Sequence, residues 1–263
     1  MTVMERVREH YEEAKTIFNE DRIIGIFLFG SQNYGLDGPD SDVDTKCIIA
    51  PTFEEVCFNK PAVNYTHIRA NKEHIEFKDI RLMMLQFRKQ NMNFVEILFT
   101  EYCIINPIYK DMWDYVTKHR EEIAHYRTLH TVKTMAAMAD QKRHALCHPY
   151  PEKLPILEKF GYDPKQLSHQ IRILKFIQDY KASLPYAECM YPKDQEKYIR
   201  WVKAGNFTLE EAKAESLAVQ IEIDKEVAEY AALVKDTTNP QVDYILDKAQ
   251  RNIVANALKK ELM

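Results

Sequence analysis

Glycine, cysteine and long apolar runs are all scarce in this chain. Only six of the 263 residues are glycine, so we expect those at positions 30, 35 and 205 to meet specific backbone requirements. The five cysteines are odd in number and widely scattered, which argues against a disulfide framework and favours a reducing, cytoplasmic setting. No charge-free apolar run approaches the length of a membrane span, and residues 1–20 carry charges instead of a signal-peptide core. We therefore expect no membrane partner.

The composition is that of an ordinary globular protein, with 46% hydrophobic and 29% charged residues. A net charge of -4 argues against a protein that coats nucleic acid without sequence preference, since such proteins are strongly basic. The charge is uneven, however, because residues 116–175 contain eleven Lys or Arg against six Asp or Glu. This local surplus is compatible with an RNA acceptor along that part of the chain.

A short apolar run that ends in a Gly-Ser turn is the first feature with chemical meaning. Residues 23–29 are apolar and rich in β-branched side chains, which predicts a buried strand. Gly30 lets the backbone pass close to a ligand, and the amides that follow it can donate to phosphate oxygens. The hydroxyl of Ser31 adds a donor beside them. The turn is therefore a candidate phosphate-binding element.

Two carboxylates one residue apart follow this turn. If residues 42–49 form a strand, Asp42 and Asp44 project from one face and Val43 packs into the other. Carboxylates this close repel each other unless a cation lies between them. Their oxygens suit magnesium or manganese, which also bridge to substrate phosphates. The alternative interpretation is a solvated surface turn over residues 37–44.

This arrangement resembles the nucleotidyltransferase superfamily that includes DNA polymerase β, whose signature is Gly-Ser followed after about ten residues by Asp-apolar-Asp. A narrower resemblance is to the minimal bacterial and phage nucleotidyltransferases, a family associated with RNA repair. It spans roughly residues 22–212. The motifs that carry it are Phe29-Gly30-Ser31, Tyr34-Gly35-Leu36, Asp40-Ser41-Asp42-Val43-Asp44, Gly161-Tyr162-Asp163-Pro164-Lys165 with residues 168–174, and Ile199-Arg200 through Gly205.

The resemblance implies transfer of a nucleotide from a nucleoside triphosphate to an acceptor hydroxyl, with release of pyrophosphate and the help of two magnesium or manganese ions. It implies that Asp42 and Asp44 hold these ions and that a third carboxylate on an adjacent strand completes the catalytic set. We predict Glu76, in a strand over residues 73–79, for this third position. Asp79 is the alternative, although it is also well placed to cap the helix that follows.

The resemblance also implies nucleotide contacts from the helical part of the chain. His169, Arg172 and Lys175 are spaced three apart and share one face of a helix predicted over residues 165–182. A guanidinium binds phosphate through two parallel hydrogen bonds. We therefore predict that Lys165, His169 and Arg172 bind nucleotide. The alternative is a solvated basic stripe.

The pattern as a whole predicts an α/β (α+β) fold. A polymerase-β-like core with a small mixed sheet, residues 1–106, precedes a mostly α-helical domain, residues 107–263, that completes the nucleotide and acceptor cleft. We expect strands at 23–29, 43–50, 73–79 and 102–105, a loop over 50–71, and helices at 4–19, 79–90, 108–119, 121–147, 165–182, 194–204, 208–235 and 240–261.

The acceptor is predicted to be an RNA 3′ end, tRNA-like or damaged. The alternatives are a protein hydroxyl, as in antitoxin nucleotidyltransferases that transfer AMP, or a nucleotide- or RNA-binding module without turnover. His144, Cys147 and His148 have the spacing of zinc ligands, but a histidine-rich helix end is the simpler interpretation. No motif identifies the preferred triphosphate or the oligomeric state.

Overall fold

A five-stranded mixed sheet forms the core of the N-terminal part in the computed structural model, which describes residues 1–38 and 41–262. The strand order is β3-β4-β2-β1-β5, with β2 and β4 parallel and the other neighbours antiparallel. The strands are β1 (Ile23–Phe29), β2 (Asp44–Ile49), β3 (Asn64–Ile68), β4 (His74–Asp79) and β5 (Cys103–Ile105). Asp40 of the predicted motif lies outside the described residues.

The chain divides into two units, which we call the sheet unit and the helical unit. The sheet unit comprises Met1–Asn33, Asp37–Tyr126 and Thr238–Met263, and the helical unit comprises Tyr34–Leu36 and Arg127–Thr237. The predicted α/β fold with a helical second half is confirmed. The predicted boundary between a catalytic domain, residues 1–106, and a helical domain, residues 107–263, stays a prediction. The two units above are defined by contacts between residues and not by function.

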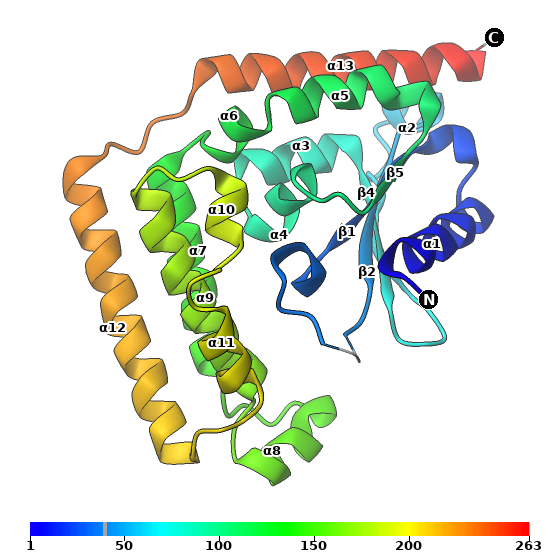
Figure 1. Ribbon diagram of the computed structural model, residues 1–263. Helices are drawn as coiled ribbons and strands as arrows, with labels where there is room; N and C mark the ends of the chain where they lie inside the picture. Colours follow the sequence, from blue (N-terminus) through cyan, green and yellow to red (C-terminus); the bar gives the residue numbers. More distant parts are fainter. Residues whose placement is uncertain (39–40, 263) are drawn as a thin grey trace. The chain divides into compact units, whose positions relative to one another are not determined.

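One face of the sheet is apolar and is covered by α1 (Val3–Ile17) (Figure 1). Alternate residues of β1, β2 and β4 form a continuous buried cluster with the inner side of this helix. The cluster comprises Val7, Tyr11, Ala14, Ile23, Ile26, Leu28, Val43, Cys47, Ile49, Ile75 and Phe77. The opposite face of β2 and β4 is therefore the one available to charged side chains.

The start of β2 differs from the prediction. The strand begins at Asp44, one residue after the predicted start at 43, so Asp42 lies before the strand and not in it. Asp44 faces Phe29 in the last residue pair between β1 and β2, so the ladder ends there. Before that point the backbone bonds to side chains, since the amide of Gln32 donates to the carbonyl of Asp42 at 2.9 Å and the Val43 N–H donates to Glu73 at 3.0 Å.

The predicted loop over residues 50–71 contains two elements that we did not expect. One is α2 (Phe53–Cys57), whose first turn has a capping box between Thr52 and Glu55. The other is β3, an exposed edge strand that pairs with β4 and stacks Tyr65 on Phe77. An exposed edge strand lacks the alternation of apolar and polar residues that identifies a half-buried one.

The second face of the sheet has its own helices. The helices α3 and α4 lie on the side of the strands away from α1 (Figure 1). The Arg88 side chain of α3 ties α13 to this layer through Asp243, at 3.0 Å, and Asp247, at 2.6 Å. The remaining helices of the sheet unit are α3 (Ile80–Arg88), α4 (Met92–Val95), α5 (Lys110–Lys118), α6 (Arg120–Ala124) and α13 (Pro240–Leu262).

The helical unit is built around α9, which contacts α7, α10, α11 and α12. Asp163 caps the start of α9 and Pro164 occupies its first turn, where the missing N–H costs no hydrogen bond. Buried Gln170 and Ser216 bond to each other across α9 and α12. The helices are α7 (Thr128–Ala145), α8 (Leu154–Phe160), α9 (Pro164–Lys181), α10 (Tyr186–Met190), α11 (Glu196–Lys203) and α12 (Leu209–Leu233).

The single helix predicted over residues 121–147 is wrong. The chain forms α6 and α7 there, separated at residues 125–127, where the sheet unit gives way to the helical unit. Neither proline nor glycine marks this break, which is why the sequence pattern runs through it. In the described part of the chain, no helix combines the length and the apolarity needed to cross a membrane.

Candidate active site

Asp44 and Glu76, two of the three predicted catalytic carboxylates, lie on the same face of neighbouring strands. Asp44 begins β2, and its Oδ1 accepts a hydrogen bond from the backbone N–H of His74 at 2.8 Å. The ring Nδ1 of His74 is 3.4 Å from the same oxygen. Lys46, two residues along β2, faces Glu76 of β4 in the parallel register. Alternation along the two strands therefore brings Asp44 and Glu76 to one face.

Asp79, the alternative third carboxylate, lies on the opposite face. It is buried, accepts the backbone N–H of Arg81 as the cap of α3, and binds the Arg81 guanidinium at 2.7 Å. These contacts satisfy both carboxylate oxygens within the first turn of the helix. The geometry thus favours Glu76 over Asp79 as the partner of Asp44.

The carboxylates on this face are chemically suited to a hard divalent cation. Asp42 is exposed just before β2, Asp44 is half-buried at its start, and Glu76 is 30% exposed on β4. Their oxygens would hold magnesium or manganese, which prefer this type of donor. Among the described residues, no three His, Cys, Asp or Glu side chains are close enough together to hold a metal ion. One oxygen of Glu76 is instead 2.5 Å from the ammonium of Lys46.

The ammonium of Lys46 is enclosed in a way that the sequence did not predict. Its side chain is only 2% exposed, and Nζ lies 3.6 Å from the centre of the Phe29 ring and 4.3 Å from that of Phe94. Burial lowers the pKa of Lys46, while Glu76, and more weakly Glu96 and Asp44, oppose this shift. The carboxylate face therefore already contains one fixed positive charge.

The Gly30 turn has the backbone form expected of a phosphate-binding loop. Gly30 has a φ of +102°, a backbone conformation that residues with a side chain rarely adopt. It is followed by the short 3-10 helix Ser31–Tyr34. Its amide points toward Oε2 of the buried Glu96, at 3.4 Å. An amide predicted to bind an anionic phosphate thus already faces an anionic oxygen. Glu96 is a further site residue that the sequence did not indicate.

A buried carboxylate holds the backbone between the two aspartates. Glu73 is 1% exposed, and its Oε1 accepts the Val43 N–H at 3.0 Å. Its Oε2 bonds to the ring of His10 at 2.9 Å and to Arg69 at 2.9 Å, and Arg6 forms an ion pair with Oε1. Glu73 therefore fixes the peptide that joins Asp42 to Asp44.

His10 completes this buried network. Its Nδ1 lies 2.9 Å from the hydroxyl of Thr45 and its Nε2 reaches Glu73. Burial, followed by the nearby charge of Arg69, lowers the pKa of His10 to about 4. The ring is therefore neutral at pH 7, and it links Thr45, near the start of β2, to the Glu73 carboxylate.

In the helical unit, Arg172 is a buried cation with unpaired donors. Its side chain is 4% exposed, and its guanidinium lies 4.0 Å from the centre of the Tyr34 ring. Among the described residues, neither Nε nor Nη1 of Arg172 has a hydrogen-bond partner. Buried donors without partners are rare and costly, so they point to a ligand of opposite charge.

Other cations surround Arg172. The pKa of His169 is held well below its usual value by burial and then by Arg172 and Lys142. The pKa of Lys142 is also lowered, by burial and then by Lys165 and Arg172. Lys153 binds Asp163 at 3.2 Å, so part of the charge in this region is compensated. The predicted residues Lys165, His169 and Arg172 thus act on one another electrostatically, and Lys142 belongs to the same group.

The alternative interpretation, a solvated basic stripe, does not describe every residue of this helix face. Lys175, the third member of the spacing, is paired with Asp179 at 2.8 Å and Asp194 at 3.0 Å. Arg172 is buried under Tyr34 and is not solvated. Helical spacing places these residues on one face, but it does not indicate which of them a distant segment covers.

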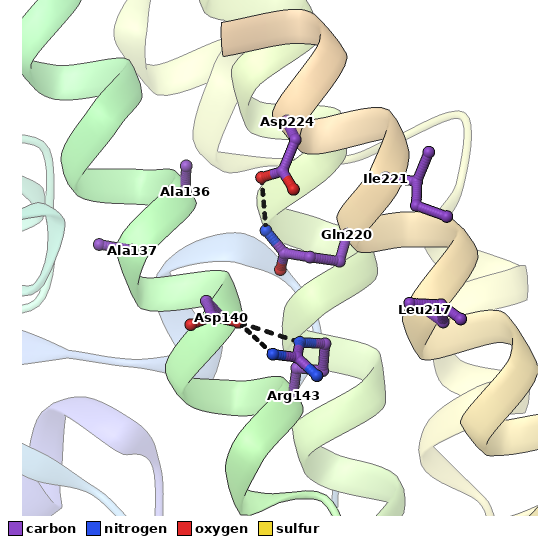
Figure 2. A pocket seen from close by; sticks show the side chains of 8 residues that line it. All are labelled: Ala136, Ala137, Asp140, Arg143, Leu217, Gln220, Ile221 and Asp224. Atoms are coloured by element: carbon purple, nitrogen blue, oxygen red, sulfur yellow. Dashed lines mark hydrogen bonds and ion pairs between the residues drawn. The ribbon is translucent and has the colours of Figure 1, made fainter.

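A separate groove of about 510 Å³ lies between α7 and α12 in the helical unit (Figure 2). Ala136 and Ala137 line its α7 side, and its polar side chains are paired within the groove. Arg143 binds Asp140 at 2.8 Å, and Gln220 donates to Asp224 at 2.9 Å. His144 bonds back to the Asp140 carbonyl. The groove shares no residue with the predicted catalytic or nucleotide-binding set.

Comparison with known families agrees with the geometry of the sheet unit. Residues 7–123 match the model of the nucleotidyltransferase domain family. This range contains the Gly30 turn, the Asp42-Val43-Asp44 motif and Glu76, so the predicted superfamily is supported for this part of the chain, and with it a transferase activity. No curated protein shows a significant match to the sequence.

Proposed function

We propose that the protein is a metal-dependent nucleotidyltransferase that moves a nucleoside monophosphate from a triphosphate, such as ATP, to an acceptor hydroxyl and releases pyrophosphate. The observation that carries the proposal is the placement of Asp44 and Glu76 on one face of adjacent strands, next to the Gly30 turn. Asp42, Asp44 and Glu76 would hold two magnesium or manganese ions. When bound, such ions lower the pKa of the acceptor hydroxyl and neutralise charge on the departing pyrophosphate.

The chain's own groups have distinct roles in this reaction. The Gly30 amide and the Ser31 hydroxyl would donate to phosphate oxygens of the triphosphate. The His74 N–H donates to Oδ1 of Asp44 and so helps to hold this carboxylate at the start of β2. Glu73 holds the backbone between Asp42 and Asp44 by accepting a hydrogen bond from the Val43 N–H. Orientation of this kind lowers the barrier by reducing the motion lost on reaching the transition state.

We propose an RNA 3′ end, tRNA-like or damaged, as the acceptor and the cytoplasm as the setting. The positive surplus over residues 116–175 supports a polyanionic acceptor. The alternatives are a protein hydroxyl and a binding module without turnover. The paired carboxylates disfavour the last, because a non-catalytic module has no physical need to hold them on one face.

We expect radioactive label from an α-³²P nucleoside triphosphate to appear on RNA. Wild-type protein would be incubated with magnesium, each of the four triphosphates in turn, and either bulk tRNA or total cell protein, and the products separated on a denaturing gel. Label on protein alone would replace the RNA acceptor with a protein one. Label on neither acceptor, with no pyrophosphate released, would contradict the proposed activity.

We further propose that Arg172, with Lys165 and His169, binds phosphate groups of the nucleotide. Replacing Arg172 by Gln is expected to weaken binding of pyrophosphate about tenfold, because a charge-assisted pair of hydrogen bonds is lost. Calorimetric titration with pyrophosphate would measure it. Lys175→Gln is the matched control, since this charge on the same helix is already paired with Asp179 and Asp194. If the Arg172 variant bound pyrophosphate as tightly as wild type, Arg172 would not be a phosphate-binding residue and its role would be structural.

A further inference from the structure

Lys46 occupies a position in the sheet where a charged side chain carries a cost. It lies in β2, between β1 and β4, and is 2% exposed. Removing an ammonium from water is unfavourable, and a protein with an apolar residue of similar size at such a position is often equally stable or more stable. A lysine at this place is therefore better explained by what its charge does than by what its packing contributes.

The partners of Lys46 belong to the carboxylate face. Its ammonium is 2.5 Å from Oε2 of Glu76, and it lies two residues from Asp44 along the same face of β2. The rings of Phe29 and Phe94 close the other sides at 3.6 and 4.3 Å. The ring faces stabilise the ammonium without neutralising it, so its charge remains directed at the carboxylates.

Glu76 thus has two competing cations. In the structure one of its oxygens binds Lys46, whereas the proposed reaction, on which this inference rests, requires it to bind a divalent ion. A carboxylate shared with a fixed ammonium binds a second cation less tightly, because the two positive charges repel each other at short range. The same ammonium reduces the repulsion between Asp44 and Glu76 when no metal is present.

We propose that Lys46 is a positioning residue that acts as the resident counter-cation of this site. It holds Glu76 in the absence of a divalent ion and thereby keeps metal affinity low until the nucleotide adds its own phosphate ligands. Metal and triphosphate then bind together, and metal alone binds weakly. The role belongs to the charge of Lys46, not to its volume.

Replacing Lys46 by Met is expected to raise the affinity for Mn²⁺ in the absence of nucleotide by about tenfold or more. Methionine fills a similar volume and packs well against the two phenylalanine rings. Electron paramagnetic resonance of free Mn²⁺ gives the affinity without any measurement of activity. Adding Glu76→Gln to the Lys46 variant should abolish the gain, because the gain comes from the released carboxylate.

The matched control is Lys78→Met, on the same face of β4. Its ammonium bonds to Asn64 at 2.6 Å and lies 4.9 Å from the centre of the Phe94 ring, so the contact between Lys46 and Glu76 remains. Mn²⁺ affinity in this variant should change less than about threefold. A comparable gain in both lysine variants would mean a general effect of charge and would overturn the proposal.

Glu76→Gln alone gives a test that does not depend on how Lys46→Met folds. If Lys46 already occupies Glu76, this change should alter Mn²⁺ affinity of the nucleotide-free protein less than about threefold, but should weaken binding strongly once triphosphate is present. A large loss without nucleotide would overturn the inference and leave the proposed function intact. No Mn²⁺ binding by wild type, even with triphosphate, would overturn both.

Discussion

Replacing Asp44 by Asn is expected to lower the rate of nucleotidyl transfer by roughly a thousandfold, because the change removes a charge at the proposed metal site. Asparagine keeps the Oδ1 that accepts the His74 N–H, so the start of β2 should be unchanged. What disappears is the negative charge that, in the proposed mechanism, would bind a divalent ion, and that also offsets the charge of Lys46. The rate of pyrophosphate release at saturating triphosphate and magnesium measures the effect.

Asp111→Asn is the matched control for this experiment. Asp111 is an exposed carboxylate of α5 in the same unit, outside the predicted site, so its loss should leave the rate within about twofold of wild type. Thermal unfolding of all three proteins separates loss of chemistry from loss of fold. Release of pyrophosphate at the wild-type rate by the Asp44 variant would remove this residue, and with it the proposed metal site, from the mechanism.

The parts of the site that could be predicted from the sequence are those set by local chemistry. The strand predicted at 23–29 is confirmed as β1. It could be predicted because a short apolar run that ends in glycine is typical of a buried strand. Strand alternation predicts which residues of each strand share a face with Asp44 or with Glu76, and the parallel pairing of β2 and β4 then brings the two carboxylates to one face. The helix predicted over residues 165–182 is also confirmed, since α9 spans Pro164–Lys181 and differs by one residue at each end.

The residues that the sequence did not indicate owe their roles to distant partners. Lys46 is recognisable only once β4 brings Glu76 beside it, and Glu96 only once its helical turn meets the Gly30 amide. One local signal was present, because Lys46 directly precedes the buried apolar run Cys47–Ile49, and a buried ammonium needs a counterion. The register between β2 and β4, which places Glu76 beside Lys46, cannot be predicted from the residue spacing within either strand.

The helical unit shows the same limit in another form. Spacing placed His169, Arg172 and Lys175 on one face of α9, but it gave no sign that Arg172 is covered by the ring of Tyr34. The segment Tyr34–Leu36 follows the Gly30 turn directly and yet belongs to the helical unit, where Lys203 donates to the Leu36 carbonyl at 2.8 Å. Contacts of this kind decide which residue of a charged helix face is buried and which stays exposed, and helical spacing does not contain them.

The Glu73 network leads to the largest expected effect on stability. Glu73→Gln is expected to lower the free energy of unfolding by about 3 kcal/mol, because it breaks a buried ion pair from one side. The amide group would turn an N–H₂ donor toward a region filled with donors from Arg6, Arg69 and the Val43 backbone. Neutral His10 cannot compensate for the lost charge, since burial keeps its pKa at about 4.

Glu13→Gln provides the comparison, because Glu13 also binds Arg69, at 2.7 Å, but is 31% exposed. An exposed pair of this kind contributes about 1 kcal/mol or less, so urea unfolding should rank the two variants clearly. At a temperature where both remain folded, only the Glu73 variant should also lose transfer activity, since only Glu73 holds the Val43 peptide between Asp42 and Asp44. Equal losses of stability and unchanged activity in both variants would mean that Glu73 acts as one more surface carboxylate and does not position the aspartates.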